Sequence, residues 1–382
     1  MDLTALASAA LLIVALALLA IALWNVVAWP SVAGDAPPVA SAVAVLIPAR
    51  DEERNLPDCL ESAIAQDSTV GEILVYDDHS TDATARIVRE FAARDRRVSL
   101  VTSRTLPQGW CGKTFGCATL AAESTMPWLV FLDADARLQP GAVRRMLGEA
   151  LGRGVSLLSP WPRLVAVSAG ERALMPLLDV VVFTLFPAPL SLRRPDPSLG
   201  LVHGACILAE RRAYDRVGGH GAVRSEIFED QRLARLWRDR GERGLCLGGR
   251  DVVSVRMYRS VGELWRGFQK NFYPAFRHAA SFWAFLILHG VVLVAPFMLL
   301  AIAPQPLVIA AALAIVAMRS ALAVRFGHGI WSVVLHPFAG LFVLAIGISS
   351  WWRCRSGRGV EWKGRVYRTT NDEAAVAAGG FE

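Results

Sequence analysis

The sequence has few charged residues, and its cysteines lack the spacing of a metal site or a disulfide framework. Of its 382 residues 19% are charged, whereas 54% are hydrophobic. This composition is too apolar for an ordinary soluble protein and not apolar enough for a polytopic transporter, so we expect a soluble domain joined to membrane segments. The six cysteines form no C-x-x-C pair, which argues against structural zinc and a disulfide framework and is compatible with a reducing cytoplasm.

Two common nucleotide-binding loops are also missing. No G-x-G-x-x-G follows the first predicted strand, which counts against a dinucleotide-binding fold. The segment Gly109–Thr114 contains Gly-Lys-Thr, but it lacks the first glycine of a Walker A loop at the required spacing. The sequence therefore favours neither a dehydrogenase nor a P-loop enzyme.

The N-terminus carries the longest apolar run. Residues 3–29 contain no charged side chain and are numerous enough to cross a bilayer. A cleaved signal peptide is the alternative, but no basic region precedes the run, and the run is longer than a typical signal core. We predict an uncleaved anchor at residues 1–30, followed by a linker that includes Gly34–Pro38.

Three more apolar stretches lie near the C-terminus, within residues 282–350: Phe282–Ala303, Leu307–Val324 and Trp331–Ser350. A basic tail, residues 351–382, follows them. If all three stretches cross and the soluble domain is cytoplasmic, the tail lies outside, against the positive-inside tendency. Either one stretch is re-entrant or interfacial, or the rule fails here; we favour a cytoplasmic tail.

A further apolar segment, residues 173–192, is interrupted by Pro176, Asp179, Pro187 and Pro189. These interruptions disfavour a membrane span. The segment is either a helix lying in the membrane interface or a buried core helix.

Residues 42–275 alternate strand and helix signals. The predicted strands are Val43–Ile47, Glu72–Tyr76, Val98–Val101 and Leu129–Leu132. Helical spacing marks Glu52–Ala65 and an Ala-rich segment near Phe115–Glu123. A third helix is expected after residue 81, with Ser80 or Thr81 as its N-cap and Ile87, Val88 and Phe91 as its apolar face. This alternation predicts an α/β fold with a mostly parallel sheet and with ligands at the carboxyl ends of its strands.

Acidic residues stand at two of those strand ends. Asp77 and Asp78 close the second strand, and Asp133 and Asp135 follow the strand that ends at Leu132. Carboxylate oxygens suit a divalent cation that bridges phosphate oxygens. By itself each pair is equally consistent with a solvated turn.

Four ordered motifs resemble family 2 glycosyltransferases, which have a GT-A fold: Ile47–Glu53, Asp77–Asp82, Asp133–Asp135 and Phe228–Gln231. The membrane segments, Gly109–Lys113 and the closing Val360–Tyr367 are similar to the lipid-directed branch of ceramide glucosyltransferase-like and hopanoid-biosynthesis-associated enzymes. The resemblance implies a Rossmann-like GT-A catalytic domain on the cytoplasmic face of the inner membrane. It implies a nucleotide-sugar donor, a UDP-sugar by preference, and a lipid acceptor (hopanoid, sphingolipid-like or polyprenyl) but no nucleic acid.

The resemblance also assigns roles to matching positions. The donor-binding residues would be Pro48, Ala49, Arg50, Glu52, Asp77, Asp78, Lys113, Asp133 and Asp135. Among these, Asp133 and Asp135 would hold Mg²⁺ or Mn²⁺ on the diphosphate, where the ion stabilises developing charge. Asp230, with Glu229 beside it, would be the general base that takes the acceptor proton while the donor is displaced with inversion.

Several of these positions have simpler alternatives. Glu229 and Asp230 precede a helical pattern, so both acids could simply favour a helix N-terminus. Lys113 either neutralises the diphosphate or is a solvated loop lysine. Trp110 and His203 either contact the acceptor or pack in the core, and His79 stands where the family often has glycine, which indicates a turn.

One departure from the family concerns the Gln/Arg-x-x-Arg-Trp motif that processive and ceramide-type relatives carry before their C-terminal membrane segments. The corresponding region, Trp265–Tyr273, does not contain it. Candidate substitutes for its diphosphate and acceptor contacts are Arg266, Gln269, Lys270, Lys363 and Arg365. A polysaccharide synthase subunit and a non-catalytic nucleotide-binding membrane scaffold are the alternative functions.

Overall fold

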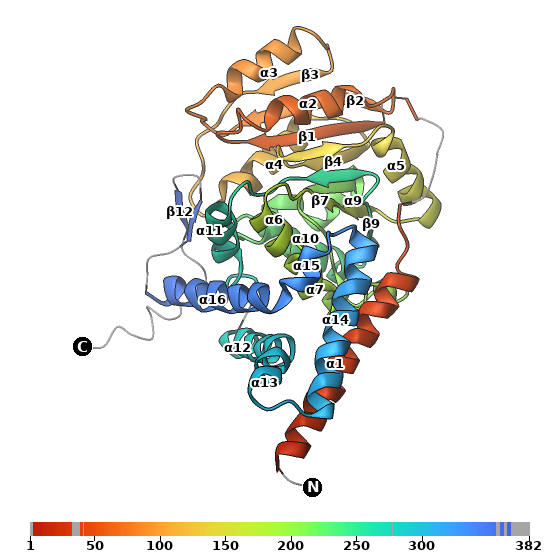
Figure 1. Ribbon diagram of the computed structural model, residues 1–382. Helices are drawn as coiled ribbons and strands as arrows, with labels where there is room; N and C mark the ends of the chain where they lie inside the picture. Colours follow the sequence, from red (N-terminus) through yellow and green to blue (C-terminus); the bar gives the residue numbers. More distant parts are fainter. Residues whose placement is uncertain are drawn as a thin grey trace, which may run out of the picture. The chain divides into compact units, whose positions relative to one another are not determined.

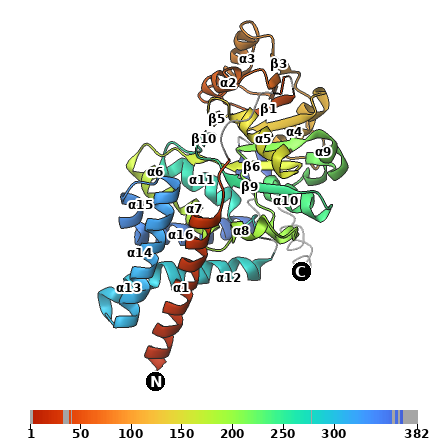
Figure 2. The same ribbon diagram turned by 90° about the vertical axis from the view of Figure 1, so that its right-hand side faces the viewer.

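The computed structural model describes residues 3–32, 39–40, 42–276, 278–356, 360–362 and 365–367 (Figures 1 and 2). The chain forms two compact units. The sheet unit comprises Pro30–Val165 and Leu190–Met257, and the helical unit comprises Met1–Trp29, Ala166–Pro189 and Tyr258–Glu382. Residues 166–189 and 258–275, which we expected within one domain of residues 42–275, thus pack with the helical unit.

A seven-stranded sheet forms the centre of the sheet unit, in the order β3-β2-β1-β4-β8-β6-β9. Its strands are β1 (Val43–Ala49), β2 (Val70–Asp77), β3 (Val98–Val101), β4 (Trp128–Leu132), β6 (Leu157–Trp161), β8 (Cys206–Glu210) and β9 (Gly244–Gly248). Neighbouring strands pair in parallel except at β8, which is antiparallel to both β4 and β6. The predicted α/β fold with a mostly parallel sheet is confirmed.

Helices cover both faces of this sheet. One hydrophobic core packs α2 (Leu56–Ile64), α3 (Thr84–Ala92) and α5 (Ala142–Arg153) against the sheet; the other packs α4 (Gly112–Glu123), α9 (Arg211–Val217) and α10 (Glu229–Asp239). Alternate residues of β1 enter the two cores, Val45 and Ile47 on one face and Leu46 on the other, as the two-residue period of a strand requires. A smaller sheet joins β5 (Ala136–Leu138), β10 (Val253–Val255) and β7 (Arg163–Leu164), and two 3₁₀ turns span Pro197–Leu199 and Gly219–Val223.

Two local predictions were wrong. The helix expected from Glu52 begins at Leu56, because the backbone N–H groups of Asp51, Glu52 and Glu53 bind side chains of the next loop instead. Neither Ser80 nor Thr81 caps α3. The N-cap residue is Ala83, and the N–H of Thr84, the first residue of α3, donates to the Asp82 carboxylate at 2.9 Å.

The helical unit contains four helices long and apolar enough to cross a membrane, among the residues described: α1 (Leu3–Ala28), Ala279–Ile302, α14 (Pro306–Phe326) and α16 (His336–Arg355). The second comprises α12 (Ala279–His289), a π-helical stretch at Gly290–Val294 and α13 (Ala295–Ile302). The remaining elements of the unit and its border are α6 (Ala169–Leu174), α7 (Leu177–Phe183), α8 (Ala188–Ser191), α11 (Val261–Asn271), α15 (Trp331–Val334), β11 (Val360–Trp362) and β12 (Arg365–Tyr367).

The apolar segment at residues 173–192 forms short helices rather than a span. Its breaks fall at Pro176, which precedes α7, and at Phe186–Pro187, before α8. Asp179 is buried and pairs with His328 at 2.8 Å. The interfacial interpretation of this segment stays a prediction.

Candidate functional site

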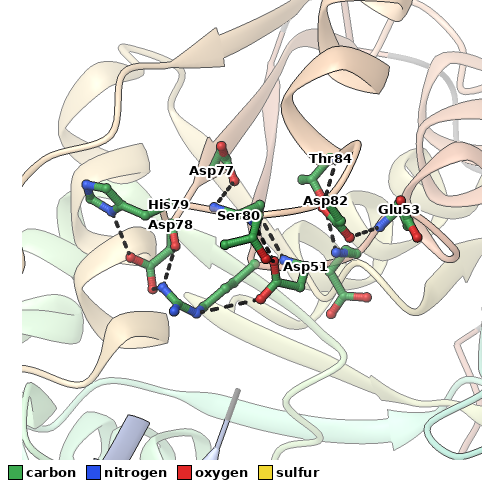
Figure 3. Close-up of polar contacts among 11 residues, drawn as sticks. Asp51, Glu53, Asp77, Asp78, His79, Ser80, Asp82 and Thr84 are labelled. Carbon is green, nitrogen blue, oxygen red and sulfur yellow. Dashed lines mark hydrogen bonds and ion pairs between the residues drawn. The ribbon is translucent and has the colours of Figure 1, made fainter. Parts of the chain in front are cut away.

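The loops after β1 and β2 are joined by a network of hydrogen bonds (Figure 3). The Asp51 carboxylate accepts the Thr81 N–H at 2.8 Å, and the Glu53 N–H donates to the Asp82 carboxylate at 3.0 Å. Asp51 and His79 both have positive φ, of 50° and 55°, so the turn expected at His79 is present. This bonding fixes the two predicted donor-binding loops against each other.

Arg50 and Asp78 are in contact within this hydrogen-bond network. The Arg50 guanidinium donates to the backbone carbonyl of Asp78 at 2.7 Å and stands 3.9 Å from its carboxylate. The Asp77 carboxylate accepts the Ser80 N–H at 3.1 Å, which holds the second loop. Two of the predicted donor-binding residues, Arg50 and Asp78, are therefore adjacent at the carboxyl ends of β1 and β2.

Lys113 bridges two acids that are far apart in the sequence. Its ammonium lies 2.8 Å from the Asp133 carboxylate and 3.0 Å from the Glu229 carboxylate. Lys113 is the second residue of α4, and the N-terminus of α4 is held by Cys111, whose N–H donates to the Arg224 carbonyl at 2.7 Å. The structure thus joins the Gly-Lys-Thr segment, the Asp133–Asp135 motif and the Glu229–Asp230 pair in one cluster.

The pKa values of Lys113, Glu229 and Asp133 are shifted in different directions. Burial opposes the charged form of Lys113, but Asp133 and Glu229 together hold the pKa of Lys113 well above its usual value. Burial would raise the pKa of Glu229, yet Lys113 outweighs it and the pKa of Glu229 falls. For Asp133 burial prevails and its pKa is raised despite Lys113. Lys113 and Asp133 keep 25% and 30% of their side-chain surface exposed, so water screens part of these interactions.

Asp230 is a half-buried carboxylate at the edge of this cluster. Burial, followed by the negative charge of Glu229, raises the pKa of Asp230 to about 7. Its Oδ1 accepts the Gln231 N–H at 2.7 Å, and its Oδ2 lies against Gly204, where an added Cβ would stand 2.8 Å away. A carboxylate with a pKa near the operating pH suits general base catalysis.

Strand pairing explains why Gly204 reaches this cluster. Leu132 of β4 pairs with Cys206 of β8, and the Asp133 N–H donates to the Ala205 carbonyl at 3.0 Å. The residues before β8 therefore run beside the Asp133–Asp135 motif. Glycine at position 204 was not predicted, since its small size matters only through a contact with Asp230 from a distant helix.

His203 is buried, and its described contacts are within the fold. Its Nδ1 accepts the Ala205 N–H at 3.3 Å and its ring meets Trp161 edge-on at 5.0 Å. Burial, together with the charge of Lys113, lowers the pKa of His203 to about 3, so the ring is neutral. Trp110 packs edge-on against Phe115 at 5.5 Å. An acceptor contact for His203 or Trp110 stays a prediction.

The protein supplies only part of the ligands that a metal ion needs. Among the residues described, no three His, Cys, Asp or Glu side chains are grouped to hold an ion, and Asp133 already contacts Lys113. Magnesium is commonly held by one or two carboxylates together with substrate phosphates. Asp133 and Asp135 fit that pattern because they follow the same strand two positions apart.

The remaining predicted residues belong to the helical unit. Arg266, Gln269 and Lys270 lie on α11, where the Gln269 amide donates to the Ser349 hydroxyl. Lys363 lies outside the described residues, and Arg365 begins β12, of which only the backbone is described. Their contacts with donor or acceptor stay predictions.

Residues 44–218 match the model of the family "Glycosyl transferase family 2", and the GT-A arrangement of acids at strand ends agrees with that match. Over this segment the chain is similar to family 2 glycosyltransferases. The match is to a family of glycosyltransferases, which are enzymes.

The chain is also similar to curated relatives and to solved structures. It is 26% identical over 348 residues to 4,4'-diaponeurosporenoate glycosyltransferase of Staphylococcus aureus (strain USA300), covering 87% of this chain and 90% of that protein. The enzyme of the same name from Staphylococcus haemolyticus (strain JCSC1435) is 29% identical over 57% of each chain. The fold is similar to a mannosyltransferase of Pyrobaculum calidifontis in complex with GDP-Man and Mn²⁺ (TM-score 0.55, 19% identity, 90% of this chain and 99% of that one).

Proposed function

We propose that this glycosyltransferase moves one sugar from a nucleotide-sugar donor, UDP-linked by preference, to a lipid acceptor at the cytoplasmic face of the inner membrane. The reaction would be metal-dependent and invert the anomeric centre. The observation that carries the proposal is the position of Asp230, a half-buried carboxylate next to Glu229 in the Lys113 cluster, with a pKa raised to about 7.

The donor end is built from the residues at the strand ends. Arg50 and Asp78 would hold the nucleoside, and Lys113 would face the diphosphate. Asp135, with Asp133, would hold Mg²⁺ or Mn²⁺ through the donor's diphosphate oxygens; the ion supplies positive charge to the leaving group. The Lys113 ammonium lies 2.8 Å from the Asp133 carboxylate, so this part of the site carries a positive charge of its own, in addition to that of any bound metal ion.

A catalytic base is needed for a hydroxyl acceptor but not for a carboxylate acceptor. A hydroxyl acceptor must lose its proton as it attacks the anomeric carbon, whereas a carboxylate acceptor arrives already ionised. The curated relatives are named for diaponeurosporenoate, a lipid acid. A base at Asp230 would suit a hydroxyl-bearing lipid, such as the hopanoid, sphingolipid-like or polyprenyl acceptors that the sequence resemblance implies.

The test uses the full chain, purified and placed in lipid nanodiscs. UDP- and GDP-linked sugars are offered with total membrane lipid, with Mg²⁺, Mn²⁺ or a chelator, and glycolipid products are identified by mass spectrometry. Asp230→Asn is compared with Asp215→Asn, an exposed carboxylate of the same unit. We expect one sugar per lipid, loss of transfer with chelator and with Asp230→Asn, and full transfer with Asp215→Asn.

Each part of the proposal has its own contrary result. Transfer retained by Asp230→Asn on a carboxylate lipid would replace the hydroxyl acceptor by a lipid acid. Products that carry a long sugar polymer would favour a polysaccharide synthase subunit. No turnover of any donor with any lipid extract would overturn the proposal.

A further inference from the structure

α1 and α14 run in the same direction. Near the start of both helices, the Ser8 hydroxyl lies 3.5 Å from the side chain of Gln305, the residue before α14. Near their ends, the Arg325 guanidinium donates to the Trp29 carbonyl at 2.9 Å and covers the Trp29 ring at 5.8 Å. Both views show the two helices side by side (Figures 1 and 2). If both cross the bilayer, the chain between them must return once.

α12, the π-helical stretch and α13 make that return. They leave α11 and end at Ile302, four residues before α14 begins at the Ser8 end of the pair. This accounts for three crossings. The remaining candidate, α16, is the least apolar of the four.

α16 lies alongside α11, a helix unsuited to the bilayer centre. Phe342 meets Trp265 edge-on at 5.3 Å, and further along both helices the Ser350 hydroxyl accepts the Tyr273 N–H at 3.0 Å and donates to the Gln269 carbonyl at 2.6 Å. α11 carries Glu263, Arg266 and Lys270 within 11 residues, and charges of this kind are costly in hydrocarbon. Contact over successive turns places α16 at the same depth as α11.

One side of α16 is an exposed apolar stripe. Its members recur at helical spacing and are 72%, 46%, 50% and 50% exposed, respectively: Phe338, Leu341, Ile348 and Trp352. Arg353 and Arg355 follow at its C-terminal end. In Figure 1 α16 runs across the direction of α1 and α14. An apolar stripe ending in tryptophan and arginine is the pattern of a helix that lies in a membrane interface.

We propose that α16 does not cross the membrane but lies in the lipid interface, with its stripe of Phe338, Leu341, Ile348 and Trp352 against the acyl chains and its arginines against anionic headgroups. The helical unit then crosses three times. An odd number of crossings brings Ser356, after α16, to the same side of the membrane as the sheet unit that follows α1. The basic end of α16 then obeys the positive-inside tendency that four crossings would violate.

The depth of the stripe is the first test. Cysteines replace Phe338, Ala345 and Trp352, which span 14 residues, and carry a fluorophore in vesicles of phosphatidylcholine and phosphatidylglycerol with lipid quenchers at shallow and deep positions. In a crossing helix these sites would differ by about 21 Å in depth. Ile309, Val316 and Val324, exposed on α14, are the matched control. The native cysteines are all buried, so the unchanged chain gives the background.

We expect one shallow quenching ratio at the three α16 sites and a ratio that changes severalfold along α14. A graded ratio along α16 would overturn the proposal. Sidedness is the second test, with a membrane-impermeant maleimide on inside-out and right-side-out vesicles. Ala93→Cys in the sheet unit and Ser356→Cys should label from one side and Leu3→Cys from the other. Labelling of Ser356→Cys from the side opposite Ala93→Cys would also overturn the proposal.

Discussion

The Lys113 ammonium lies 3.0 Å from the Glu229 carboxylate, and Glu229 is the residue next to Asp230. This one contact separates the roles of two neighbouring acids. Lys113 lowers the pKa of Glu229, whereas burial and the negative charge of Glu229 raise the pKa of Asp230 although Lys113 opposes that rise. Two carboxyls with divergent pKa values are the usual sign of divided acid and base roles.

Replacing Lys113 should therefore change the pH dependence of transfer as well as its rate. In Lys113→Met the Glu229–Asp230 pair loses the cation that lowers both pKa values, so the rising limb of the pH–rate profile should move to higher pH. Lys113→Arg, which keeps the charge, is the matched control and should move it less. The measurement is kcat against pH with saturating donor; a lower rate with an unmoved profile would mean that Lys113 acts on the diphosphate alone.

The unchanged enzyme should itself gain activity through neutral pH. A general base works when it is deprotonated, and the pKa of Asp230 is raised to about 7. Activity should thus be low at acid pH, half-maximal near pH 7 and level above it. Because ligands alter burial, kcat/KM, which reports the free enzyme, is the quantity to compare. A profile that is flat from acid to neutral pH would exclude Asp230 as the base.

The sheet and the acidic strand ends could be predicted from the sequence because both depend on local patterns. Val98–Val101 was predicted with its observed bounds, and the strand before Asp133 differs by one residue. The joining of Lys113 to Glu229 could not be predicted, since it depends on how α4 and α10 pack on the same face of the sheet. The contacts of Asp82 at the start of α3 could not be predicted either. Its carboxylate accepts the N–H of the nearby Thr84 and also that of Glu53, which belongs to the loop after β1.

Asp82 should matter for donor binding more than for chemistry. Its carboxylate accepts the N–H groups of Thr84, at the start of α3, and of Glu53, so Asp82→Ala loosens the contact between the two donor loops. We expect a loss of stability of about 1 kcal/mol, typical of a lost hydrogen bond, and a raised donor KM with kcat little changed. Asp82→Asn keeps one acceptor oxygen and should be milder. Equal effects on KM and kcat would place Asp82 closer to the reaction than its contacts indicate.

Arg319 should be a stability residue of the helical unit. It is fully buried in α14 and donates to the carbonyls of Ser332 at 2.6 Å and Pro176 at 3.4 Å. Arg319→Met would leave these carbonyls unpaired, with a cost on the order of 3 kcal/mol. Thermal unfolding in detergent should occur several degrees lower, whereas Leu313→Ala, exposed on the same helix, should change little. An unchanged unfolding temperature would show that water replaces both bonds.

Gly204 should be needed for the position of Asp230 and not for folding. An alanine Cβ at 204 would stand 2.8 Å from Asp230 Oδ2 and 3.4 Å from Lys113 Nζ. The end of a side chain can move away at little cost in stability, but the carboxylate is then displaced from its catalytic position. A shift near 1 Å commonly lowers kcat by roughly ten- to a hundredfold. Gly152→Ala, a helical glycine of the same unit with open space at its Cβ, is the control and should retain kcat. Unfolding temperature and kcat are measured for both variants. Full kcat in Gly204→Ala would mean that Asp230 does not need its observed position for transfer.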